Sequence, residues 1–121
     1  MLREAWLEER TAAKSARGRG DLDGEWQHLE RAHILSQPMA GAHVQTHVLM
    51  LGAAFRRRDP HEVLGQMFRL VVAGPGSLTG RYPVGNTGGA DVSAFKRMEV
   101  PEDLRAVLEA EDEAPAGSIN D

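Results

Sequence analysis

The sequence contains no cysteine and few aromatic residues. Without thiols, neither a disulfide framework nor a thiolate metal site can form, so any bound metal must have nitrogen and oxygen ligands. Aromatic residues make up 5% of the chain, so the core must consist mainly of Leu, Val, Ala and Met. Because Leu, Ala and Met are strong helix formers, such a core favours a helical protein.

Long apolar runs and an excess of positive charge are also lacking. No stretch approaches the roughly 18 consecutive apolar residues of a membrane span, and no basic segment followed by an apolar one opens the chain. The net charge is -4, and the run Arg56–Arg58 is too short to supply the basic face on which nucleic acids or anionic membranes bind. We therefore expect a cytoplasmic protein that binds neither nucleic acid nor membrane.

The length of 121 residues is typical of a single domain, and glycines and prolines divide its first part into four helical segments. We expect helices over residues 2–17, from an N-cap at Asp21 or Asp23 to about Ser36, from Pro38 to the arginine run, and over residues 60–73. The clearest start signal is residues 59–62, which combine an N-cap aspartate with proline and glutamate in the first helical turn. Short connections make neighbouring helices antiparallel. The sequence predicts an all-α fold, a small bundle of about four antiparallel helices.

The rest of the chain departs from this pattern. Residues 74–96 are rich in glycine and contain two prolines, so we expect a long loop there. Its interleaved apolar residues predict an ordered strap that covers the bundle. A short helix is expected from Pro101 to about Ala110, which makes residues 1–110 one helical domain. The acidic residues 111–121 are expected to be disordered.

Two histidines of the third segment, His43 and His47, lie four residues apart and therefore on one helix face. The apolar residues of that face are Val44, Met50, Leu51, Ala54 and Phe55. Both imidazoles are therefore expected to point into the core. This spacing is the one at which two helical histidines can chelate one ion.

The first two segments bring further ionisable residues toward the same interior. His33 shares the apolar face of the second segment with Leu29, and Glu30 precedes it by three residues, a spacing used by carboxylate-bridged metal proteins. Glu9 lies on the alanine-containing face of the first segment. Three neighbouring helices are thus predicted to contribute to one cluster.

The remaining histidines, His28 and His61, are expected to face solvent. Glu25 and His28 form a second pair at the same spacing, but only one such pair can face a given site.

A buried ion without a partner costs several kcal/mol against a total stability of roughly 5–15 kcal/mol. The clustered groups must therefore either hydrogen-bond to one another or bind a cation. We predict that His33, His43 and His47 hold one transition metal, with Glu30 or Glu9 as the carboxylate ligand. Zn, Fe and Cu all accept imidazole and oxygen ligands.

An open coordination position would allow Lewis-acid or oxygen chemistry. The sequence shows no separate general base, so it leaves open whether the protein is an enzyme. The strap side chains able to reach a substrate or the outer shell of the site are Arg81, Tyr82, Asn86 and Thr87.

Two resemblances accompany these patterns. Residues 12–35, with Gly-Asp-Leu-Asp between two helices, and residues 55–70 around Asp59-Pro60 resemble tetratricopeptide-type helix pairs. The stretches 26–33 (WQHLERAH), 43–47 (HVQTH) and 80–89 (GRYPVGNTGG) together resemble a family of short bacterial proteins catalogued only as a domain of unknown function. This resemblance covers Arg10 to Leu108 and implies a bacterial helical protein without implying an activity.

A second hypothesis belongs to a different class. Tetratricopeptide-like helix pairs often bind proteins, so the chain would then be a metal-free adapter that binds a protein partner or forms a homo-oligomer. Helical repeats usually need three or more units to bury a continuous core, and this chain offers about two. Convergence of the imidazoles would favour the metal site, and an exposed apolar surface with separated histidines would favour the adapter.

Overall fold

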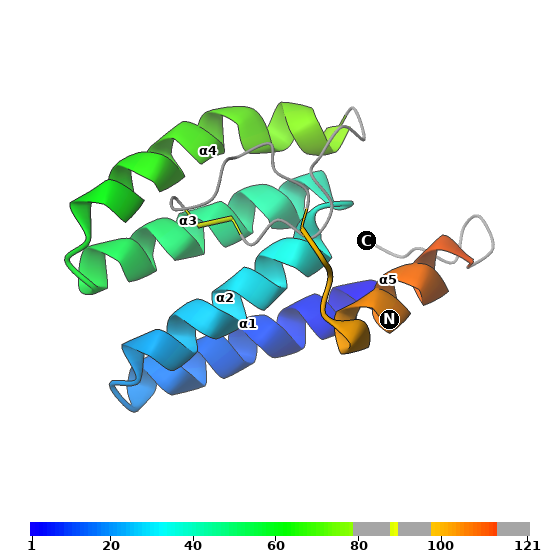
Figure 1. Cartoon of the computed structure of the whole chain (residues 1–121), viewed down its shortest axis with the longest axis horizontal. Helices are drawn as coiled ribbons and strands as arrows, with labels where there is room; N and C mark the ends of the chain where they lie inside the picture. Colours follow the sequence, from blue (N-terminus) through cyan, green and yellow to red (C-terminus); the bar gives the residue numbers. More distant parts are fainter. Residues whose placement is uncertain (79–87, 90–97, 114–121) are drawn as a thin grey trace.

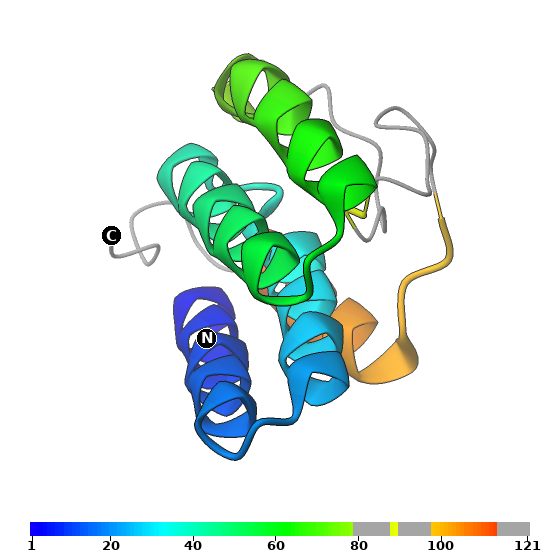
Figure 2. The same ribbon diagram turned by 90° about the vertical axis from the view of Figure 1, so that its left-hand side faces the viewer.

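The computed structural model describes residues 1–78, 88–89 and 98–113, and within them it contains five helices and no strand. In chain order these are α1 (Leu2–Gly18), α2 (Leu22–Ser36), α3 (Ala40–Arg56), α4 (Pro60–Leu78) and α5 (Glu102–Asp112). Helices α1 and α2 form one antiparallel pair and α3 and α4 form a second, as both views show (Figures 1 and 2). The pairs meet where α2 packs against α3, and α5 packs against α1 and α2. The predicted all-α class is confirmed.

Two aspartates start helices as the sequence predicts. The carboxylate of Asp21 accepts a hydrogen bond from the backbone N–H of Gly24 at 2.9 Å, and that of Asp59 accepts one from Glu62 at 3.1 Å. Each bond satisfies a backbone donor that a helix leaves unpaired in its first turn. Between α1 and α2, Gly20 adopts a φ of 75°, a left-handed conformation that favours glycine.

Three predicted boundaries are wrong. Helix α3 begins at Ala40 rather than Pro38, because Pro38 lies in a turn closed by a hydrogen bond from the backbone N–H of Met39 to the carbonyl of Ser36. Helix α4 continues beyond Ala73 to Leu78, through the first residues of the expected loop. Gly74 helps to explain this, because it lacks the Cβ that disfavours helical backbone before a proline.

The third difference is at α5, which ends at Asp112 rather than near Ala110. The backbone N–H of Leu2 donates to the carboxylate of Glu111 at 3.2 Å, a contact that holds the last turn of α5 against the start of α1. Residues 114–121 of the expected tail lie outside the described residues. Of the predicted strap, the described residues include only 74–78, which belong to α4, and 88–89.

The core is formed by small and aliphatic residues around one buried tryptophan. Trp6 of α1 is 1% exposed, and its indole N–H donates to the hydroxyl of Thr46 in α3 at 2.9 Å. The apolar cluster around it comprises Leu2, Ala32, Ile34, Leu35, Ala42 and Leu104. A second cluster comprises Ala13, Leu29, Met50 and Ala53. Trp6 thus connects α1 to α3 as well as filling the space beside α2.

The face that α3 buries differs from the prediction in part. His43, His47, Met50 and Ala54 are buried as expected, but Phe55 is 63% exposed. Small residues such as Ala42, Thr46 and Ala53 occupy the contact face instead. Phe55 lies roughly on the opposite side of α3 from these three residues, so it faces solvent when their face is buried. None of the described helices combines the length and apolar composition of a membrane span.

Candidate metal centre

Three histidine side chains meet where α2 packs against α3. His33 comes from the last turn of α2, and His43 and His47 come from successive turns of α3. The Nε2 atom of His33 lies 3.1 Å from Nε2 of His47 and 3.0 Å from Nε2 of His43. All three residues are buried, with exposed fractions of 3% to 5%. The structure therefore brings the three predicted histidines together, and we refer to them as the histidine triad.

The spacing of the triad suits a shared ion. Imidazole nitrogens bind zinc at about 2.0–2.1 Å, so two of them in a tetrahedral site lie roughly 3.3 Å apart. The two Nε2 separations in the triad are within a few tenths of an ångström of that value. One potential ligand atom from each histidine lies within 4.8 Å of the other two. Small shifts of the rings would therefore place three nitrogens around one ion.

The proton on His47 is positioned by Gln66 of α4. The side-chain oxygen of Gln66 accepts a hydrogen bond from Nδ1 of His47 at 2.7 Å. Its nitrogen donates to the carboxylate of Glu62 at 2.8 Å and to the carbonyl of Gly88 at 2.6 Å. Because those two partners are acceptors, the amide must present its oxygen to His47. Neutral His47 then carries its proton on Nδ1, and its Nε2 lone pair faces the triad.

Burial controls the charge of His47. The pKa of His47 is lowered to about 4, mainly because burial removes the ring from water; the hydrogen bond with Gln66 opposes this shift and the positive charge of Arg69 adds to it. The imidazole is therefore neutral at pH 7, as metal coordination requires. Arg69 is itself 5% exposed, and burial also lowers its pKa.

The backbone of Gly88 closes against the triad. Gly88 has a φ of 84°, and a Cβ at this position would lie 2.7 Å from Cδ2 of His33. Only a residue without a side chain allows this approach. The carbonyl of Gly88 accepts a hydrogen bond from the amide of Gln66, so the backbone of Gly88 contacts both His33 and Gln66.

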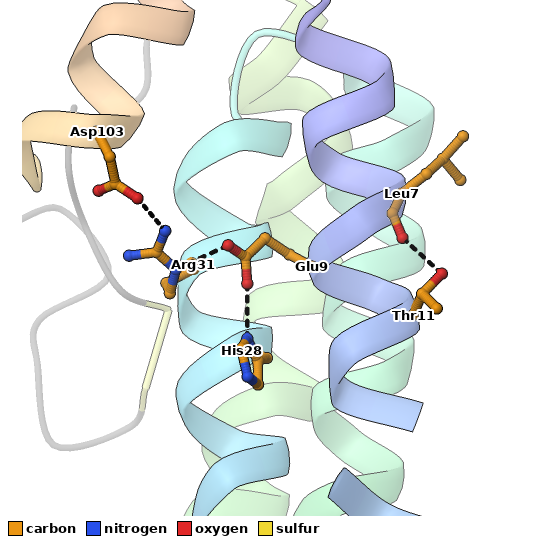
Figure 3. A network of polar contacts seen from close by, with 6 residues as sticks. All are labelled: Leu7, Glu9, Thr11, His28, Arg31 and Asp103. Atoms are coloured by element: carbon orange, nitrogen blue, oxygen red, sulfur yellow. Dashed lines mark hydrogen bonds and ion pairs between the residues drawn. The ribbon is translucent and has the colours of Figure 1, made fainter. Parts of the chain in front are cut away.

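Glu9, one of the two predicted carboxylate ligands, lies in a separate polar network. Figure 3 shows Glu9 of α1 bridging His28 and Arg31 of α2, with Nδ1 of His28 at 2.7 Å and Nε of Arg31 at 2.8 Å. Arg31 also pairs with Asp103 of α5 (Figure 3). Glu9 therefore belongs to a network that joins three helices. Helices α1 and α3 both pack against α2, and Glu9 of α1 forms its polar contacts with α2 rather than with the triad.

The outcomes differ for Glu30, for the two histidines that were expected to face solvent, and for the four strap residues. Glu30 is half-buried, and within the described residues the group of mutually close ligating atoms contains the three histidines but not Glu30. His61 is exposed as expected, whereas His28 is only partly exposed because of its contact with Glu9. The four strap positions expected near the site lie outside the described residues; these are Arg81, Tyr82, Asn86 and Thr87.

Sequence reasoning missed the contribution of α4. Glu62, Gln66 and Arg69 are all buried, although they form the polar side of an otherwise apolar helix. Their spacing of four and three residues places them on one helix face, which is the signal that could have identified them. A polar helix face usually lies in solvent, and only the packing of α4 against α3 shows that this one faces inward.

Comparison with known proteins gives a family but no activity. A family described as "Protein of unknown function (DUF3703)" matches residues 1–108. The chain belongs to this family. No curated protein and no solved structure matches the chain significantly. The predicted resemblance to a family of unknown function is confirmed, whereas the bacterial source and the tetratricopeptide-like helix pairs stay predictions.

Proposed function

We propose that this DUF3703 protein binds one divalent transition metal ion through the Nε2 atoms of the histidine triad. The observation that carries the proposal is the convergence of three buried imidazole nitrogens at separations of 3.0 and 3.1 Å. Burying three titratable rings side by side is unfavourable unless their lone pairs and protons have partners. A metal ion can replace the hydrogen bonds among the three Nε2 atoms with one shared partner.

The triad contains one proton that a metal must displace. Gln66 directs the Nε2 lone pair of His47 toward His33, so the 3.1 Å contact between the two Nε2 atoms requires a hydrogen on Nε2 of His33. A metal replaces this hydrogen bond. The proton of neutral His33 then moves from Nε2 to Nδ1, because imidazole binds a metal through the nitrogen that lacks a hydrogen. Protonation of the imidazoles to their charged form competes with the metal, so metal uptake becomes weaker as pH falls.

The ligand set favours particular metals. Three imidazoles without thiolate suit Zn, Fe(II) and Cu(II), and the general affinity order places Cu(II) first. Three protein ligands leave at least one coordination position for water or another molecule, an arrangement found in catalytic zinc sites. That position is compatible with Lewis-acid or oxygen chemistry. Glu30, which the sequence offered as a ligand, is not needed for three-fold coordination.

The experiment uses full-length protein without a histidine tag. Elemental analysis should find about one equivalent of metal after purification or after reconstitution with Zn, Fe(II) or Cu(II). His47→Ala should abolish stoichiometric uptake, whereas His61→Ala removes an exposed histidine outside the triad and should leave uptake unchanged. The proposal fails if the wild-type protein binds none of the three metals and its histidine NMR signals do not respond to them.

The adapter hypothesis gains support from a separate observation. Large apolar side chains of α4 are exposed, including Leu64 at 68% and Val71 at 74%. Such a surface is typical of a protein contact. It lies on the opposite side of α4 from Gln66, so a metal site and a protein contact are compatible in one molecule.

A further inference from the structure

Helix α4 buries its charged residues and exposes large apolar ones, the reverse of an ordinary surface helix. Its two charged residues, Glu62 and Arg69, are 6% and 5% exposed and lie on the side that faces the rest of the molecule. Four large apolar residues lie on its outer side at helical spacing, and we call them the outer stripe: Leu64, Met67, Phe68 and Val71. Each is more than half exposed. A surface helix normally shows the reverse arrangement.

Helix α4 also lies at the edge of the molecule. Both views place it beside α3 and away from α1 and α2 (Figures 1 and 2). Among the helices that the structure describes, α4 packs against α3 alone. One side of α4 is therefore buried, and the outer stripe faces away from the core.

We infer that the outer stripe is a homodimer interface in which α4 of one copy packs against α4 of a second copy. Leu64, Phe68 and Val71 are separated by four and three residues, the spacing of an apolar seam between paired helices. A twofold axis through such a seam brings the same patch of both copies together, so one continuous stripe is complementary to itself.

Area and charge both favour a second copy. At these exposures the four side chains present roughly 400 Å² of apolar surface, about half of the 800 Å² that each partner buries in an interface of standard size. A polar rim normally supplies the remainder. Both charged residues of α4 face inward, so the seam contains no charged side chain. Two copies with a net charge of -4 can therefore pair there without bringing like charges together along the seam. The same absence of outward-facing lysine and arginine on α4 disfavours an anionic membrane as the occupant.

This inference is independent of the metal site. Glu62 and Gln66 contact the site from the inner side of α4, and the outer stripe lies on the other side. The oligomeric state should therefore be the same in protein treated with a chelator and in protein supplied with zinc. A failure of metal binding would leave the interface untouched, and the reverse also holds.

The test compares two matched substitutions in the full chain. Leu64→Glu introduces a charge into the outer stripe, and Leu7→Glu makes the same change at an exposed leucine of α1, which is 40% exposed. Sedimentation equilibrium of the wild type should give a mass that rises with concentration from 13.2 kDa toward twice that value. Leu64→Glu should weaken association by about 100-fold or more, whereas Leu7→Glu should associate like the wild type. Far-UV circular dichroism checks that both variants keep their helix content.

Three outcomes overturn the inference. A wild type that stays monomeric up to millimolar concentration shows that the stripe does not bind a second copy. An oligomer that survives Leu64→Glu places the interface elsewhere. Flotation of the wild type with phosphatidylcholine and phosphatidylserine vesicles, lost in Leu64→Glu, identifies a lipid surface as the occupant instead.

Discussion

At the scale of single residues, the proposed metal site depends on Gln66 as well as on the histidines. A glutamine amide has a donor end and an acceptor end, and here Glu62 and Gly88 take up the donor end. The acceptor end therefore selects the proton position of His47. Groups that contact metal ligands in this way commonly tune affinity by orienting the ligand and fixing its tautomer.

Replacement of Gln66 by leucine tests this role. Gln66→Leu removes the acceptor for Nδ1 of His47 and one donor to the carbonyl of Gly88, so we expect metal affinity to fall by about 10- to 100-fold. Loss of these buried hydrogen bonds should also lower the free energy of unfolding by about 1–3 kcal/mol. Competition titration with a chromophoric chelator measures the affinity. Gln45→Leu, at an exposed position of α3, serves as the control and should change neither quantity.

Equal metal affinities of Gln66→Leu and the wild type would show that the amide does not position His47. The role assigned to Gln66 would then be structural only.

At the scale of elements, the site depends on how three helices and the backbone at Gly88 come together. The turn before α3 places His33 beside His43, and α4 brings Gln66 to the other side of His47. The backbone at Gly88 then packs against the ring of His33. None of these segments forms the site alone, because each supplies only one or two of its groups.

Gly88 and Gly20 provide a matched pair for testing how the backbone at Gly88 contributes to the site. Both have positive φ, but a Cβ at Gly20 would meet nothing within 4 Å, whereas one at Gly88 would collide with the imidazole of His33. Gly20→Ala should lower the free energy of unfolding by about 1–2 kcal/mol through backbone strain, and Gly88→Ala should lower it by more, because the collision with His33 adds to the same strain. Only Gly88→Ala should also weaken metal binding, by about tenfold, because it displaces the His33 ring. Thermal unfolding and metal titration of both variants measure the two effects.

If Gly20→Ala weakened metal binding as much as Gly88→Ala, the effect would come from general destabilisation. The steric contact with His33 would then have no specific role.

At the scale of the whole molecule, stability is linked to the neutral state of the buried site. Folding transfers His47 from water to a buried position where its pKa falls from 6.5 to about 4. The unfolded chain therefore binds more protons than the folded one between these two values. Stability from this group is fully present above pH 6.5 and is lost as pH falls toward 4.

We predict that metal-free protein loses roughly 3 kcal/mol of unfolding free energy from His47 alone between pH 6.5 and pH 4, since each pKa unit corresponds to about 1.36 kcal/mol. Urea unfolding at several pH values in the presence of a chelator measures the change. The variant His47→Gln lacks this titration and should show a shallower dependence over the same interval. A wild-type free energy that stays constant from pH 6.5 to pH 4.5 would contradict the prediction.

A structural feature can be predicted from the sequence when it depends on residues that are close together in the chain. Helix starts at Asp21 and Asp59 follow from hydrogen bonds within three residues, so the sequence alone determines them. The shared face of His43 and His47 also follows from helix geometry. The sequence by itself therefore determined the all-α class and the histidine pair on α3.

Only the tertiary structure decided which helix faces are buried and which polar groups meet. Glu9 has the spacing of a core residue but pairs with His28 and Arg31, and Gln66 lies on a polar helix face but contacts His47. A helix sequence presents several faces, and the face that becomes buried depends on the surfaces of the neighbouring helices. The place of Glu9 in its network and the role of α4 could not be predicted, because both depend on contacts between segments far apart in the chain.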